Sequence, residues 1–90
     1  MMDTKILQQQ LRDLPGWAFE GGMLRKTFRF PNFVDAVGWT VRVGFLAEAH
    51  GHHPDIDIRY NRITLALVTH DAGNQVTQKD LDLARAVEAL

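Results

Sequence analysis

The sequence predicts an α+β domain, a four-stranded antiparallel sheet with three helices packed on one face. Two segments, 17–30 and 55–69, alternate apolar and polar residues on both sides of a turn signal, which is typical of β-hairpins. Three others, 4–13, 32–49 and the segment from 77 onward, carry apolar residues at helical spacing behind helix-capping residues. The order is therefore α-β-β-α-β-β-α, which favours helices gathered on one side of an antiparallel sheet.

The first helix is expected over residues 4–13, where Asp3 or Thr4 can cap its start. A Leu-Pro-Gly sequence directly after it stops the helix. Two strands follow, Trp17–Glu20 and Leu24–Phe30, and the pair of glycines between them is a hairpin turn signal.

The second helix is expected to begin after Asn32, a capping residue, and to end near Glu48 or Ala49, before Gly51. One apolar stripe of this helix is expected to be buried, formed by Phe33, Val37, Val41 and Phe45. A second apolar set lies away from it and is a candidate face for association, unless it is buried within the monomer: Val34, Trp39, Val43 and Leu46.

The second hairpin is expected to turn at Asn61-Arg62, which would pair Tyr60 with Ile63 and bring His70 opposite His53. One face of this hairpin is expected to meet the helices through Ile56, Ile58, Tyr60, Ile63, Leu65 and Leu67. After a loop, Thr77-Gln-Lys-Asp80 opens the last helix as a capping-box-like start.

Bulk composition excludes several classes of protein. Ninety residues predict a single domain over residues 1–90, and the absence of cysteine excludes disulfides and thiolate metal sites. Ten basic and eleven acidic residues give a net charge of −1, so the basic footprint of a nucleic-acid-binding protein is missing. No signal peptide or membrane-spanning run is visible, and we expect a cytoplasmic protein with no membrane partner.

All four histidines, His50, His52, His53 and His70, lie between positions 50 and 70. The second hairpin returns the last of them to the others, and imidazoles donate or accept protons near neutral pH. The rival interpretation is a metal site that combines the first three with Glu48, but a run of this kind without a second ligand cluster is a weak indication.

The residues that join these histidines to their surroundings resemble a known family. The segments are Glu48-Ala-His-Gly-His52-His53-Pro54, Tyr60-Asn61, Thr69-His70 and Thr77-x-x-Asp80. Together they resemble the signature of the pterin-4a-carbinolamine dehydratases, also called 4a-hydroxytetrahydrobiopterin dehydratases.

The resemblance implies a hydro-lyase that dehydrates 4a-hydroxytetrahydropterin to quinonoid dihydropterin, in the tetrahydropterin recycling that serves aromatic amino-acid hydroxylases. It implies no metal or redox cofactor, a small-molecule pterin substrate, and a homodimer or homotetramer. The alternative is a non-catalytic protein on the same fold, which acts in binding or assembly or as a dimerisation cofactor. Relatives without catalysis would be expected to lose the histidines, and their retention here favours the enzyme.

The same resemblance implies the site. His52, His53 and His70 carry over as the catalytic set, with the first two expected to transfer protons. The expected substrate contacts are Glu48, Trp17, Pro54, Asp55 and Asp80. Three alternatives stand beside them: Glu48 as an ordinary charge at a helix end, Asp80 as a helix cap, and Trp17 as a hydrophobic anchor.

Two further points qualify the resemblance. Tyr60 falls on the expected core face and is interpreted as structural. The loop from Asp71 to Thr77 departs from the Gly-Gly-Leu-Thr that the family often has after this histidine, which alters the approach to the last helix.

Overall fold

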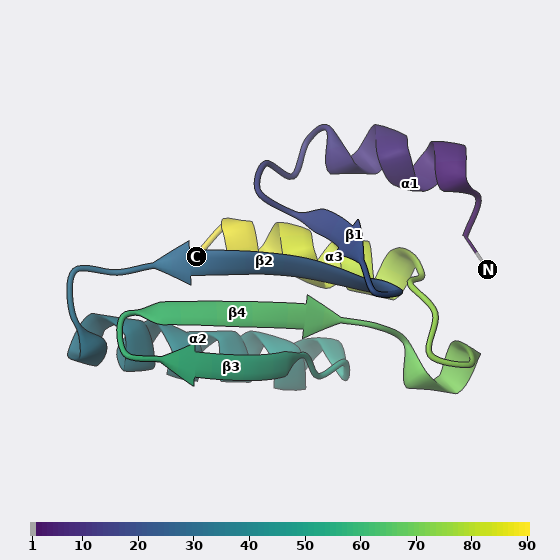
Figure 1. Ribbon diagram of the computed structural model, residues 1–90. Coiled ribbons are helices and arrows are strands. Elements are labelled where there is room, and N and C mark those ends of the chain that lie inside the picture. The colour runs from purple at the N-terminus through teal and green to yellow at the C-terminus, as the bar shows by residue number, and fades with distance from the viewer. Residues whose placement is uncertain (1) are drawn as a thin grey trace.

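A computed structural model describes residues 2–90 and has the predicted order of helices and strands (Figure 1). The elements are α1 (Thr4–Leu11), β1 (Ala18–Glu20), β2 (Met23–Arg29), α2 (Phe33–His50), β3 (Asp55–Arg59), β4 (Arg62–Leu67) and α3 (Gln78–Glu88), with a short 3-10 turn η1 (His70–Ala72) before α3. The strands form one sheet in the order β1-β2-β4-β3, and every neighbouring pair is antiparallel. The predicted α+β class is confirmed.

Local capping signals fix where the helices begin and end. Asp3 accepts a hydrogen bond from the backbone N–H of Lys5 at 2.7 Å, and Asn32 accepts one from that of Asp35 at 2.8 Å. Gly51 ends α2 in the left-handed region, with φ of 60°. These contacts join neighbours in the chain, which is why the sequence predicts them well.

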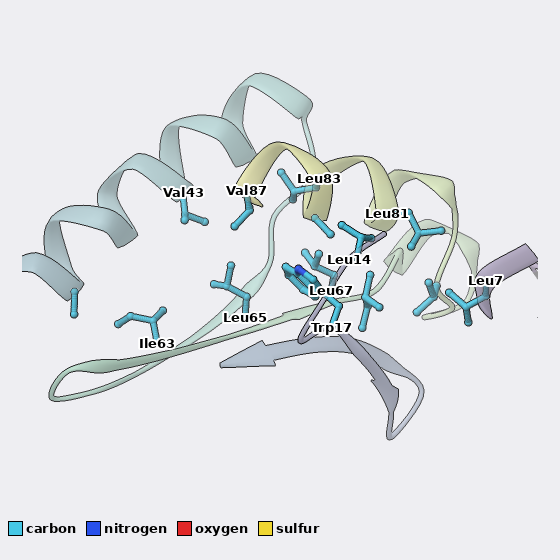
Figure 2. Close-up of a cluster of buried hydrophobic side chains, with 14 residues drawn as sticks. Leu7, Leu14, Trp17, Val43, Ile63, Leu65, Leu67, Leu81, Leu83 and Val87 are labelled. Carbon is cyan, nitrogen blue, oxygen red and sulfur yellow. The ribbon is translucent and has the colours of Figure 1, made fainter. Parts of the chain in front are cut away.

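The hydrophobic core lies between one face of the sheet and helices α2 and α3 (Figure 2). Leu24, Ile63, Leu65 and Leu67 enter it from the strands, and Leu81, Leu83 and Val87 from α3. Helix α1 reaches the same core through Leu7. Within residues 2–90, none of the helices is long and apolar enough to cross a membrane.

The expected buried stripe of α2 is wrong. Val41 is 54% exposed and Phe45 74% exposed, whereas Ala36, Val43 and Ala47 are buried. Residues spaced seven and eleven apart stay close to one line along a helix, while repeated steps of four drift by about 40° each around its axis. The helix therefore meets the core through Ala36, Val43 and Ala47, and four of its large apolar side chains stay exposed: Phe33, Val34, Val41 and Phe45. For most of the second apolar set the alternative of burial within the monomer holds, because Val43 is buried and Trp39 and Leu46 are partly buried against the core; of the four, only Val34 is exposed.

The turn of the second hairpin lies one residue earlier than expected, at Tyr60-Asn61, and Arg59 pairs with Arg62. Asn61 fixes this position because its carbonyl accepts from the Phe30 N–H and its side-chain amide donates to the Phe30 carbonyl, both at 2.9 Å. The register shifts by two residues, so each strand side chain keeps its expected face.

Tyr60 is the exception, because it enters the turn with φ of 52° and is 67% exposed instead of being a core residue. Ile56 and Ile58 are also exposed instead of buried, at 40% and 46%, since β3 is an edge strand with a neighbour on one side alone.

Candidate active site

Three of the four histidines line one concavity, where the chain enters β3 and leaves β4. The cavity volume is about 320 Å³, at the lower end of the range for small-molecule sites. Its walls are formed by Gly51, His52, His53, Pro54, Asp55, Thr69, His70, Asp71 and Lys79. The expected proximity of His53 and His70 is found here, although direct opposition in the strand ladder is not, because β4 ends at Leu67.

His52 is placed by the end of α2. The left-handed Gly51 turns the chain so that the backbone N–H of His52 donates to the carbonyl of Ala47 at 3.1 Å, a Schellman-type ending. Its ring Nε2 then lies 2.5 Å from Oδ1 of Asp80, and only 11% of the His52 side chain is exposed. Because a carboxylate only accepts hydrogen bonds, Nε2 carries the hydrogen and donates it.

Asp80 is fully buried and serves two purposes. Its Oδ2 accepts from the backbone N–H of Thr77 at 2.8 Å, which closes the capping box of α3, and from the hydroxyl of Thr69 at 2.9 Å. A further hydrogen bond of 2.7 Å joins the two threonine hydroxyls. The expected helix-capping role is present, and the same carboxylate also holds His52. Its negative charge lies in the first turn of α3, where the helix dipole favours it.

His53 has a similar partner in a very different environment. Its Nε2 lies 2.7 Å from Oε1 of Glu48, and the two side chains are 66% and 79% exposed. Glu48 belongs to the last turn of α2, and it orients the imidazole from the solvent side.

His70 begins η1 directly after the strand. Its Nδ1 donates to the side-chain carbonyl of Asn74 at 2.8 Å, and Asn74 adopts a left-handed φ of 59°. The backbone N–H of Thr69 donates to the carbonyl of Gln75 at 2.8 Å, which closes the loop that carries both residues. This loop is the one that departs from the family pattern, and Asn74 within it provides the imidazole with an acceptor.

The three imidazoles therefore share one arrangement. Each commits one ring nitrogen to a side-chain oxygen, and within residues 2–90 no protein group hydrogen-bonds the other. A neutral imidazole held in this way keeps a lone pair on its second nitrogen, and a protonated one keeps a donor there. Imidazoles held in this way can consequently both deliver and accept protons.

The fourth histidine lies outside the concavity. His50 closes α2, and its Nδ1 lies 2.9 Å from the carbonyl of Leu46. In the part of the chain that the structure describes, no three histidine, aspartate or glutamate side chains gather as metal ligands would.

The other residues expected to contact the substrate differ in where the fold places them. Pro54 and Asp55 line the concavity, whereas Asp80 does not line it and is linked to it through its hydrogen bond with His52. Trp17 is not brought to this site. It is 5% exposed in the hydrophobic core, where it makes a T-shaped contact with Phe28 with ring centroids 5.9 Å apart, so the alternative of a hydrophobic anchor fits it.

Three residues of the wall are not among the predicted site residues: Thr69, Asp71 and Lys79. Thr69 carried a usable signal, because it is a polar residue that continues the apolar run of β4 and precedes a histidine. Such a buried hydroxyl needs a partner, and the capping box of the next helix supplies it. The exposed Lys79 and Asp71 carried no such signal.

Comparisons with known proteins agree with this geometry. A family model described as Pterin 4 alpha carbinolamine dehydratase matches residues 1–90. A protein of Roseiflexus sp. (strain RS-1), provisionally named a pterin-4-alpha-carbinolamine dehydratase, is 52% identical over 90 residues, which are all of this chain and 95% of the relative. A protein of Acidobacterium capsulatum with the same provisional name is 48% identical over 89 residues, or 99% of this chain and 96% of that protein.

Two solved structures are similar as well. The crystal structure of a transcriptional coactivator/pterin dehydratase from Brucella melitensis has a TM-score of 0.89 and 32% identity, over 98% of this chain and 95% of that one. A pterin dehydratase-like protein identified as a RuBisCO assembly factor in the alpha-carboxysome has a TM-score of 0.65 and 20% identity, over 81% and 83% of the two chains. At that identity the second likeness concerns the fold alone.

Proposed function

This chain belongs to the pterin 4 alpha carbinolamine dehydratase family, and we propose that it dehydrates 4a-hydroxytetrahydropterin by histidine acid–base catalysis. In this reaction a proton is delivered to the 4a-hydroxyl oxygen, and the C–O bond breaks with its electron pair leaving as water. The adjacent ring nitrogen loses its proton, and its electrons form the C=N bond of the quinonoid dihydropterin. The reaction therefore needs one proton donor and one acceptor on the same substrate.

The observation that carries this proposal is the shared arrangement of His52, His53 and His70. All three line a single concavity large enough for a small heterocycle, and each has one ring nitrogen that no protein group hydrogen-bonds within residues 2–90. We assign proton transfer to His52 and His53, and positioning of the pterin, or a share in proton transfer, to His70. Pro54 and Asp55 are assigned to the wall that holds the substrate.

Glu48 and Asp80 act through the histidines in this proposal and are positioning residues. Asp80 holds the Nε2–H of His52 and stabilises the imidazolium that forms when the ring takes up a proton, as carboxylate partners of catalytic histidines do. Glu48 does the same for His53, from the solvent side.

The test is the rate of 4a-hydroxytetrahydropterin dehydration, followed by absorbance, for the wild type and for a His52→Ala/His53→Ala variant. We expect rapid turnover by the wild type and a loss of at least about a hundredfold in the variant. His50→Ala is the matched control, because this histidine lies outside the concavity, and its rate should stay within about twofold. No acceleration by folded wild-type protein would overturn the proposal and leave a binding or assembly role.

We also propose that the protein is a homodimer or homotetramer. The support is the large apolar side chains that α2 leaves exposed, Phe33, Val34, Val41 and Phe45. Exposed apolar patches on a folded chain mark association surfaces. Sedimentation of the wild type should give a mass of at least two chains, and Phe45→Glu should reduce it without unfolding the protein. A wild-type monomer at micromolar concentration would contradict the proposal.

A further inference from the structure

A second concavity lies on the face of the sheet opposite α2 and α3 and is strongly basic. Four arginines line it, with Thr27, Thr64 and Asp57 between them: Arg25, Arg29, Arg59 and Arg62. The chain has seven arginines, so more than half of them converge on this one face. This local excess of positive charge contrasts with the net charge of −1 of the whole chain.

Three of these arginines form a straight row across the sheet. Arg29 of β2 is paired with Arg62 of β4, which is paired with Arg59 of β3. Directly opposed residues have Cβ atoms about 5 Å apart, and like charges in such positions destabilise a sheet. The row therefore carries an electrostatic cost in the unliganded protein.

Carboxylates relieve only a small part of this cost. Arg59 pairs with Asp57 at 3.2 Å, and this pair is well exposed to solvent. Within residues 2–90, neither Arg29 nor Arg62 has a carboxylate within 4.0 Å. The next row inward holds Thr27, Thr64 and Asp57. The two threonine hydroxyls hydrogen-bond each other at 2.8 Å, which uses one of their hydrogens and leaves the other free to donate to an anion.

We propose that this arginine row binds a compact polyanion, a small molecule with two or more phosphoryl groups. Guanidinium groups bind phosphate oxygens through paired N–H donors, and they remain charged at all physiological pH values. The row spans three strands, roughly 10 Å, which suits two adjacent phosphoryl groups. A long nucleic acid would need a more extended basic surface than this chain offers.

The test uses inorganic pyrophosphate as the probe, with thermal unfolding and two-dimensional amide NMR as readouts. At a concentration about tenfold above the dissociation constant, the midpoint Tm of the wild type should rise by roughly 6–11 °C. NMR shifts should concentrate on the arginine row. Sodium chloride at equal ionic strength should produce a smaller rise.

The decisive variant is Arg29→Gln/Arg62→Gln, with Arg42→Gln on α2 as the control for loss of an arginine elsewhere. The double variant should lose the pyrophosphate response and, without ligand, should melt above the wild type because the opposed charges are gone. An equal response to sodium chloride, an equal loss in Arg42→Gln, or binding of an oligonucleotide without binding of pyrophosphate would overturn the proposal.

This inference does not depend on the proposed dehydratase activity. The row flanks the β3–β4 turn, and the histidines lie beyond the opposite end of β4. Pterin turnover should therefore be unchanged in Arg29→Gln/Arg62→Gln, whichever way the binding experiment ends.

Discussion

Two neighbouring histidines bind carboxylates at nearly equal distances, yet in opposite environments. The His52–Asp80 contact is 2.5 Å and the His53–Glu48 contact 2.7 Å. The side chains of the first pair are 11% and 0% exposed, and those of the second 66% and 79%. By distance alone, the two histidine–carboxylate interactions would be judged equally strong. Their burial makes them different, because water and salt screen the exposed pair.

The difference extends to the partners of each carboxylate. Asp80 also accepts from Thr69 and Thr77, so its position is determined by three donors in a fixed network. Glu48 has a single partner on a solvated helix end. We infer that His52 is held more firmly than His53, so that of the two groups proposed for proton transfer one is rigid and the other can follow the substrate.

The largest effect is expected from Asp80→Asn. The amide cannot accept from Thr69, Thr77 and His52 together, so a buried network is broken. We expect a loss of about 3 kcal/mol in the free energy of unfolding, measured with urea, and a fall in kcat of about a hundredfold or more.

Asp82→Asn is the control for this change, since it lies on the exposed side of the same helix. It should leave both quantities nearly unchanged. If Asp80→Asn lost stability but kept its kcat, Asp80 would be a helix cap only, and the buried pair would have no part in catalysis.

A smaller effect is expected from Thr69→Val, which keeps the shape of the side chain and removes its hydroxyl. One donor to the buried Asp80 disappears, at a cost of about 1–2 kcal/mol in the free energy of unfolding. As a positioning residue, Thr69 should affect kcat more than KM, by about tenfold.

Thr69→Ser should restore most of this kcat, because the hydroxyl returns. Thr64→Val provides a comparison, since it removes a hydroxyl that bonds another threonine on the open face of the sheet. An equal loss of kcat in Thr69→Ser and Thr69→Val would show that packing matters here and the hydrogen bond does not.

The same contrast between local and distant contacts explains what the sequence predicts well. The caps at Asp3, Asn32 and Thr77 and the stop at Gly51 join residues close in the chain, and all are found as expected. The approach of His70 to His52 and His53 follows from a hairpin whose turn is displaced by only one residue.

Other features depend on distant contacts and could not be predicted. Neither apolar set expected on α2 is the line that is buried, because which side of the helix meets the core depends on how the helix is rotated against the sheet, and local sequence does not fix that rotation. In the sequence, a helix-capping role fully explains Asp80. Its contact with His52, which is 28 residues away in the chain, becomes visible only in the fold. The aromatic ring of Trp17 could equally stack on a flat substrate, and only its packing against Phe28 assigns it to the core.

The smallest effect is expected from Glu48→Gln, which removes the charge opposite His53 and keeps a hydrogen-bonding group in place. Exposed ion pairs contribute at most about 1 kcal/mol, so the free energy of unfolding should hardly change. We expect kcat to fall by about threefold at low ionic strength, and the difference from wild type to shrink as sodium chloride approaches 1 M, because salt screens the pair that the wild type retains. Asp80→Asn should show no such convergence, since its pair is buried. A loss in Glu48→Gln that is as large as that in Asp80→Asn, or equally insensitive to salt, would mean that burial does not distinguish the two pairs.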